Sequence, residues 1–181
     1  MIKKTSPAKS GLLLGFLFGL IMVLEFVIMY VIGMKSLVNS SAGLIVNSAN
    51  YLILPLLFIF LGCNNYKNNI NNGNITLSEC LKVGISITFV ASIIYAAFNV
   101  IFNIVFPDFV NEMIEISKEA MISKTPNLTV EQLEAGMTMI KKFMNPFIVF
   151  PVTLAMYSFF GLIYSLIIGA FVKTKNLNSN I

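Results

Sequence analysis

The chain has 181 residues, of which 57% are hydrophobic and 11% are charged, and its mean hydropathy is +0.85. A soluble domain carries about 25% charged residues, so this composition excludes an ordinary soluble protein and indicates one integral membrane domain over residues 1–181. The net charge of +4 comes from scattered lysines, which do not form the basic patch of a nucleic-acid-binding protein; the expected partner is the lipid bilayer.

The first apolar segment, residues 11–33, is long enough to cross the hydrocarbon as a helix, which takes about 20 residues. Lys3, Lys4 and Lys9 precede it, as in a signal peptide. The apolar part of a signal peptide, however, is only about 7–15 residues long. We therefore expect an uncleaved membrane helix.

Three glycines of this helix, Gly11, Gly15 and Gly19, recur at every fourth residue and share one face. Small residues at this spacing let two helix backbones approach closely in a membrane. The pattern predicts a helix-packing face, whose partner is either another helix of the same chain or a second copy of the protein.

The same segment contains one acid, Glu25. At 1.5 Å per residue it lies about 21 Å beyond Gly11, a little past the middle of the bilayer. An ionised acid at that depth is costly. Because no lysine lies deep enough to pair with it, we expect its protonated, neutral form to be favoured.

The second predicted span covers residues 43–62 and contains Asn47 and Asn50 in its first turns. An asparagine-rich segment follows, which we expect to begin as a flexible loop. It ends in Thr76-Leu-Ser-Glu79, which has the spacing of a helix-capping box. Cys63 and Cys80 flank this loop, and a disulfide between them is one alternative. On a cytosolic face we expect both thiols to stay reduced.

The third predicted span, residues 83–106, carries a polar stripe on an otherwise apolar helix. Tyr95 and Asn99 lie at about the depth of Glu25, so we expect one of them to hydrogen-bond it. Tyr157 of the fourth predicted span, residues 147–172, adds a further polar group. The predicted intramembrane polar cluster is Glu25, Tyr95, Asn99, Asn103 and Tyr157.

Residues 107–146, between the third and fourth spans, show two amphipathic helical patterns. Asp108 is the expected cap of the first, and Thr129 with Gln132 forms a capping box for the second. These helices either cover the outer end of the bundle or form a hairpin that binds a partner. The fold class is therefore all-α integral membrane, with four transmembrane helices and an amphipathic helical segment between helices 3 and 4.

Lysine placement predicts the orientation in the membrane, since lysines are enriched in cytoplasmic segments. With both termini in the cytosol, the inner segments hold seven of the twelve basic residues, namely Lys3, Lys4, Lys9, Lys67, Lys82, Lys173 and Lys175.

The composition excludes most enzyme chemistry. The chain has no histidine and two widely spaced cysteines, so common nucleophilic and metal mechanisms lack their residues. We expect no catalytic residue, cofactor or metal.

Several segments together resemble a known family. They are the glycine-rich first helix, "GNITLSECLKVG", "FPDF", "LTVEQLEAGM" and the closing "GLIYSLIIGAFVKTK". In their order and spacing the chain resembles a family of small bacterial inner-membrane proteins with four helices, catalogued only as a domain of unknown function. The resemblance implies the four-helix topology and a place in the bacterial inner membrane, but no activity.

Two functional hypotheses follow. The first is a non-catalytic membrane component that packs with itself, as a homo-oligomer, or with a membrane-protein partner. The second is a small transporter or ligand-binding membrane protein that uses Glu25.

Overall fold

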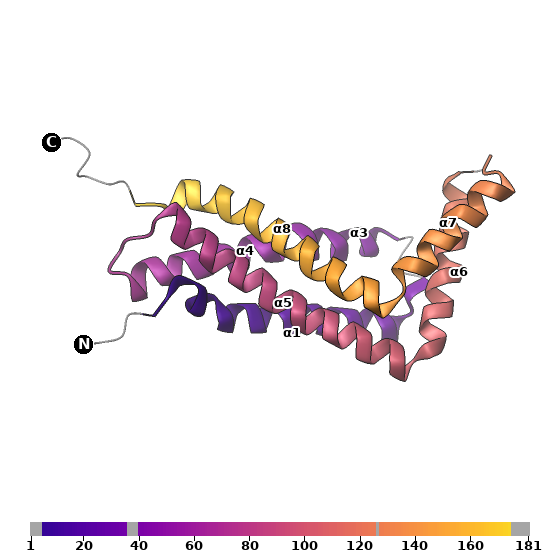
Figure 1. Ribbon diagram of the computed structural model, residues 1–181, viewed down its shortest axis with the longest axis horizontal. Helices are drawn as coiled ribbons and strands as arrows, with labels where there is room; N and C mark the ends of the chain where they lie inside the picture. The colour runs from indigo at the N-terminus through magenta and orange to yellow at the C-terminus, as the bar shows by residue number, and fades with distance from the viewer. Residues whose placement is uncertain (1–4, 36–39, 126, 175–181) are drawn as a thin grey trace.

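Four long helices lie side by side in the computed structural model (Figure 1), which describes residues 5–35, 40–125 and 127–174. They are α1 (Pro7–Ile32), a composite second span, α5 (Leu77–Val105) and α8 (Pro146–Val172). All four are long and apolar enough to cross a membrane. Between α5 and α8, α6 (Pro107–Lys124) and α7 (Val130–Phe143) form a hairpin at the end of the bundle opposite the start of α1 and the end of α8. The predicted fold class is confirmed.

The second span is longer than the sequence predicted. It joins α3 (Ser41–Ser48), the π-helical turn η1 (Ala49–Ile53), α4 (Leu54–Asn65) and a second π-helical turn, η2 (Tyr66–Ile70). The prediction of a flexible loop after Cys63 is therefore wrong for residues 64–70, which are helical. Amide hydrogen bonds one turn apart support this end: the Asn68 and Asn69 side chains donate to Asn64 and Asn65 over 2.8 and 2.7 Å.

Capping side chains set where α5 and α7 begin. Thr76 and Thr129 accept from the backbone of Glu79 and Gln132, whose side chains bond back to the caps, so both predicted capping boxes are confirmed. The predicted Asp108 cap of α6 is wrong. The helix instead begins directly at Pro107, whose fixed φ suits a first helical position and whose missing N–H needs no partner there.

The closest packing in the bundle joins α1 to α5. A Cβ added at Gly11 would lie 2.7 Å from the Val83 carbonyl oxygen, and one at Gly15 would lie 2.7 Å from that of Ile87. At Gly19 it would lie 2.9 Å from the Ile94 side chain. The glycine face predicted from the sequence thus lies against a helix of the same chain, backbone to backbone.

A disulfide joins α4 to α5 through Cys63 and Cys80, whose Cα atoms are 5.5 Å apart. Both residues are fully buried. The expectation of two reduced thiols is wrong for this structure, because the unexpected continuation of the helix beyond Gly62 places Cys63 directly beside the first turn of α5.

Replacing Gly15 with leucine should separate α1 from α5, because the new side chain would meet backbone atoms that cannot rotate away. We expect the free energy of unfolding in lipid nanodiscs to fall by about 1–3 kcal/mol, the usual cost of overpacking. The matched control is Leu13→Phe, which also adds volume to α1 but at a side chain that is 69% exposed to the lipid side. Equal stability of the two variants would contradict the packing described above.

Candidate functional site

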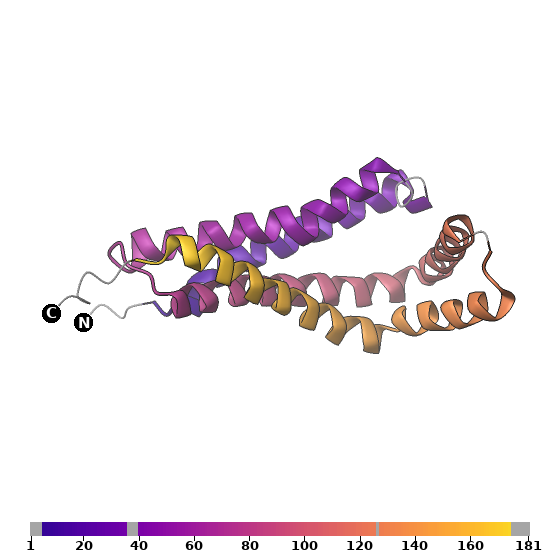
Figure 2. The ribbon, with the colours of Figure 1, turned by 90° about the horizontal axis from the view of Figure 1, so that it is seen from above.

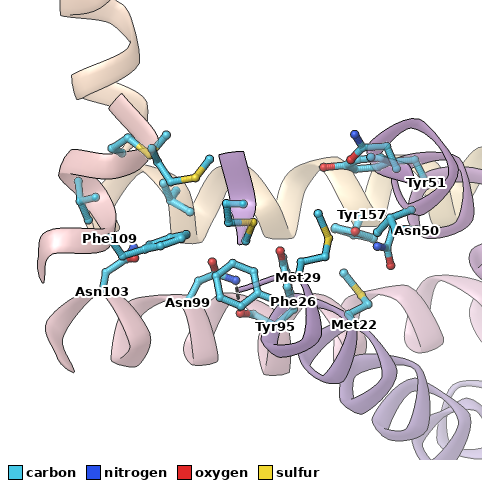
Figure 3. A pocket seen from close by; sticks show the side chains of 18 residues that line it. Met22, Phe26, Met29, Asn50, Tyr51, Tyr95, Asn99, Asn103, Phe109 and Tyr157 are labelled. Carbon is cyan, nitrogen blue, oxygen red and sulfur yellow. Dashed lines mark hydrogen bonds between the residues drawn. The ribbon is translucent and has the colours of Figure 1, made fainter. Parts of the chain in front are cut away.

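A cavity with a volume of about 300 Å³ lies between the spans near the α6 end of the bundle. We call it the central pocket (Figure 3). Its lining is a mixture of thioethers, aromatic rings and amides, with no charged side chain among the described residues that line it. The lining consists of Met22, Phe26, Met29, Met34, Gly43, Val46, Asn47, Asn50, Tyr51, Tyr95, Asn99, Asn103, Phe109, Val110, Met113, Met144, Val149 and Tyr157.

The change of side-chain size along α1 explains why the pocket lies at this end. The face that carries glycine at positions 11, 15 and 19 continues as Met22, Phe26 and Met29, all of which line the pocket. Glycine allows backbone contact with α5, whereas the larger side chains hold the helices apart. Figure 2 shows the second span and α8 diverging toward the α6 end.

Helix α6 forms the end wall of the pocket through an aromatic cluster. Phe109 of α6 packs edge-on against Phe26 of α1 and Phe102 of α5, with ring centroids 5.6 and 5.2 Å apart. Phe109 and Ile116 are buried against the ends of these helices. The structure thus shows that α6 covers the end of the bundle. Partner binding by residues 107–146, the other interpretation, stays a prediction.

One ion pair ties this wall to the end of α1. The Lys35 amino group donates to Glu119 over 2.8 Å. The hydrogen bond to Glu119, and then its negative charge, raise the pKa of the Lys35 amino group above its ordinary value. Lys35 therefore keeps its positive charge at neutral pH.

The second span reaches the pocket at its π-helical turn, which carries Asn50 and Tyr51. Pro55 has no N–H, so it cannot bond the carbonyl group of Tyr51 four residues earlier. The Tyr164 hydroxyl of α8 donates to that carbonyl over 2.6 Å. Single π-helical turns are frequent at functional sites, and this one turns Asn50 and Tyr51 into the wall of the pocket (Figure 3).

Glu25 lies behind this wall rather than on it. Its side chain is half-buried and lies near the side chain of Asn50, which does line the pocket. We expected Tyr95 or Asn99 as its partner, and that expectation is wrong. The Asn99 amide instead donates to the Tyr95 carbonyl of its own helix over 3.0 Å.

Three oxygen atoms around the pocket have no hydrogen-bond partner although they are buried. They are Glu25 Oε2, Asn50 Oδ1 and Asn103 Oδ1. A buried polar atom left unpaired costs about 1–3 kcal/mol, so native structures nearly always provide a partner from protein or ordered water. When Glu25 is ionised, all three atoms are acceptors, and none of them can donate a hydrogen bond.

The structure brings most of the predicted polar cluster together. Tyr95, Asn99, Asn103 and Tyr157 all line the central pocket, and Glu25 reaches it through Asn50. The sequence reasoning missed Asn50 and Tyr51, and it did not find the methionines. The available signal was Asn50 five residues before Pro55, because a proline inside a span disturbs the helical turn that precedes it.

The described residues hold no group of three or more acidic, cysteine or histidine side chains that could bind a metal. Outside the pocket, the polar group richest in contacts is the Glu79 carboxylate. It accepts from the Thr76 N–H over 2.8 Å and from the Tyr66 hydroxyl over 3.2 Å. These bonds hold the start of α5 against the second span, which is a structural role.

Comparison with known proteins identifies the family. A family described as proteins of unknown function, DUF4199, matches residues 13–174. The chain belongs to the DUF4199 family. No curated protein and no solved structure matches it. The match covers α1 from residue 13 onward, the other three spans and the α6–α7 hairpin. All residues that line the pocket therefore lie within the part of the chain that matches the DUF4199 family.

Removing the Tyr164 hydroxyl should destabilise the protein, because the Tyr51 carbonyl would lose its donor inside a helix that is apolar enough to span a membrane. We expect Tyr164→Phe to lower the free energy of unfolding in nanodiscs by about 1 kcal/mol. Tyr30→Phe is the control, since the Tyr30 hydroxyl makes no hydrogen bond within the described residues. If both variants match the wild type, the hydroxyl does not support the π-helical turn.

Proposed function

We propose that this DUF4199 protein is a non-catalytic membrane protein that binds a small amphipathic molecule in the central pocket. The observation that carries the proposal is the set of unpaired buried oxygens on Glu25, Asn50 and Asn103. A bound molecule with hydrogen-bond donors would satisfy these atoms.

The chemistry of the lining supports binding rather than catalysis. Ligand sites are mostly apolar cavities of about 300–1,000 Å³ with a few well-placed polar groups, which matches the size and lining of this pocket. The chain has no histidine, and amide and thioether groups are poor nucleophiles and poor proton carriers at neutral pH. They are suited to contact and orientation.

Packing with a second copy or with a membrane-protein partner has less support. The glycine face that suggested it is already filled by α5. The large exposed apolar side chains of the four spans are those expected of any surface in contact with lipid.

For location, our proposal is the bacterial inner membrane with both termini in the cytosol. Lys9, Lys67, Lys82 and Lys173 all belong to the bundle end at which α1 begins and α8 ends, while Lys3, Lys4 and Lys175 lie outside the described residues. Lysine enrichment favours this end as cytosolic. The Cys63–Cys80 disulfide lies at the same end and weighs against that orientation, because cytosolic disulfides are rare.

Lysine placement and the disulfide favour opposite orientations in the membrane, and reporter fusions decide between them. We expect green fluorescent protein joined after residue 181 to fluoresce in cells, and alkaline phosphatase inserted between α6 and α7 to be active. The reverse pattern would place the termini outside and the disulfide in an oxidising compartment.

The pocket itself is tested by thiol labelling. In Met29→Cys the introduced thiol would line the pocket, and we expect N-ethylmaleimide to label it at least about tenfold faster than the thiol of Leu13→Cys. A thiol in lipid cannot ionise, and the thiolate is the reactive form. Labelling of the wild type gives the background, since both native cysteines are buried and paired.

Adding Val46→Trp to Met29→Cys should fill the pocket and slow the labelling. If Met29→Cys reacts no faster than Leu13→Cys, no solute enters the pocket and the proposed function is wrong.

A further inference from the structure

The charge of Glu25 is the starting point, and the inference rests on the proposed function. Of the charged residues described within the four spans, Lys9, Lys67, Glu79 and Lys82 lie at the bundle end where α1 begins. Glu25 alone lies near the other end, about 10 Å before Ile32 at 1.5 Å per residue. The described structure contains a single salt bridge, Lys35–Glu119, so no lysine within it neutralises Glu25.

Without a positive partner, burial favours the neutral carboxyl expected from the sequence, whereas a positive charge beside it favours the ionised form. Acids within a membrane commonly mark binding sites for ligands or ions. A ligand that carries the missing positive charge would favour the ionised form of Glu25. The Asn50 side chain lies near Glu25, and its oxygen has no hydrogen-bond partner. Two unpaired oxygens, Glu25 Oε2 and Asn50 Oδ1, therefore belong to neighbouring side chains.

The unpaired atoms also define the hydrogen-bonding character of the ligand. All three are oxygens, and once a positive ligand favours ionised Glu25, all three can only accept hydrogen bonds, so the ligand must donate. An alkylammonium group has three N–H donors and no acceptor, as in the lysine side chain. An uncharged acceptor such as a ketone or an ester would leave these oxygens unpaired.

Aromatic rings surround the same part of the pocket. Tyr51 and Tyr157 stack with ring centroids 5.9 Å apart, and the ring of Tyr95 meets that of Phe26 edge-on at 6.4 Å. Figure 3 shows Tyr51, Asn50 and Tyr157 together on one side of the pocket. Ring faces attract ammonium groups, the more strongly where water is excluded.

The remaining lining fits an apolar body attached to the charged group. Met22 and Met29 project into the pocket beside Phe26 (Figure 3), and flexible thioethers make favourable contacts with aromatic rings of varied shape. Asn103 lies further along the wall toward α6 (Figure 3), where its free oxygen can accept from a second donor.

We infer that the central pocket binds a lipophilic primary amine in its ammonium form, with Glu25 as the counter-ion and Asn50 as a hydrogen-bond acceptor. The ammonium group binds beside Asn50, on the side of the pocket where Glu25 lies. The apolar body of the amine lies against Met22, Phe26 and Met29.

The test uses two probes of nearly equal shape, 1-naphthylmethylamine and the uncharged 1-naphthylmethanol. The chain has no tryptophan, so naphthyl fluorescence can be followed on protein in nanodiscs, with empty nanodiscs correcting for partition into lipid. We expect the amine to bind at least about tenfold more tightly than the alcohol, since close charge pairs commonly contribute this much.

Glu25→Gln should remove that preference by weakening amine binding to the level of the alcohol, while alcohol binding stays unchanged. The unchanged alcohol affinity also shows that the variant is folded. Glu131→Gln, which makes the same change at an exposed acid of α7 outside the pocket, should leave the ratio of the two affinities as it is.

Equal affinities of the two probes for the wild type, or a preference that survives in Glu25→Gln, would overturn the inference. So would the absence of binding by both probes. If the thiol at position 29 is nevertheless labelled rapidly, the pocket still serves as a binding site and only the assignment of an amine is wrong.

Discussion

The backbone contact between α1 and α5 is the constraint on which the rest of the structure depends. In a membrane, lipid tails are as apolar as the helix surfaces, so helices associate through close packing rather than through exclusion of water. Gly11 and Gly15 bring α1 onto the carbonyl groups of α5, and Gly19 ends this contact. Beyond it, Met22, Phe26 and Met29 occupy the same face and separate the helices. The helices are therefore in close contact at one end of the bundle and enclose the pocket at the other. The position of the pocket follows from where the glycine face of α1 ends.

A hollow region inside a membrane protein must also satisfy its backbone and side-chain polar groups. The second span shows how this is achieved in part. Pro55 releases the Tyr51 carbonyl, Tyr164 of α8 bonds it, and the resulting turn brings Asn50 to Glu25. The hydrogen bonds still missing, on Glu25, Asn50 and Asn103, all lie around the pocket. These unpaired oxygens favour a binding function over a purely structural one.

The sequence alone predicts the architecture but not the pairing of its polar groups. Apolar length predicts the four spans, and the capping boxes at Thr76 and Thr129 predict where two helices begin, because both signals are local. The partner of Glu25 is a matter of how helices are arranged in space. Depth along the membrane pointed to Tyr95 and Asn99, whereas the π-helical turn rotates Asn50 of another span toward the acid. The continuation of the second span to Ile70 was missed because asparagine favours loops in general, while here each amide bonds another one turn away.

The most direct test of the central claim measures where an ammonium group lies in the pocket. Solid-state NMR on protein with ¹³C-labelled glutamate carboxyl groups and ¹⁵N-labelled 1-naphthylmethylamine reports the distance between ligand nitrogen and carboxyl carbon. One glutamate signal, absent in Glu25→Gln, should be dephased by a ligand nitrogen within about 4 Å, the range of an ion pair. Dephasing of a different glutamate, or of none, would contradict the account and leave Glu25 without a role in binding.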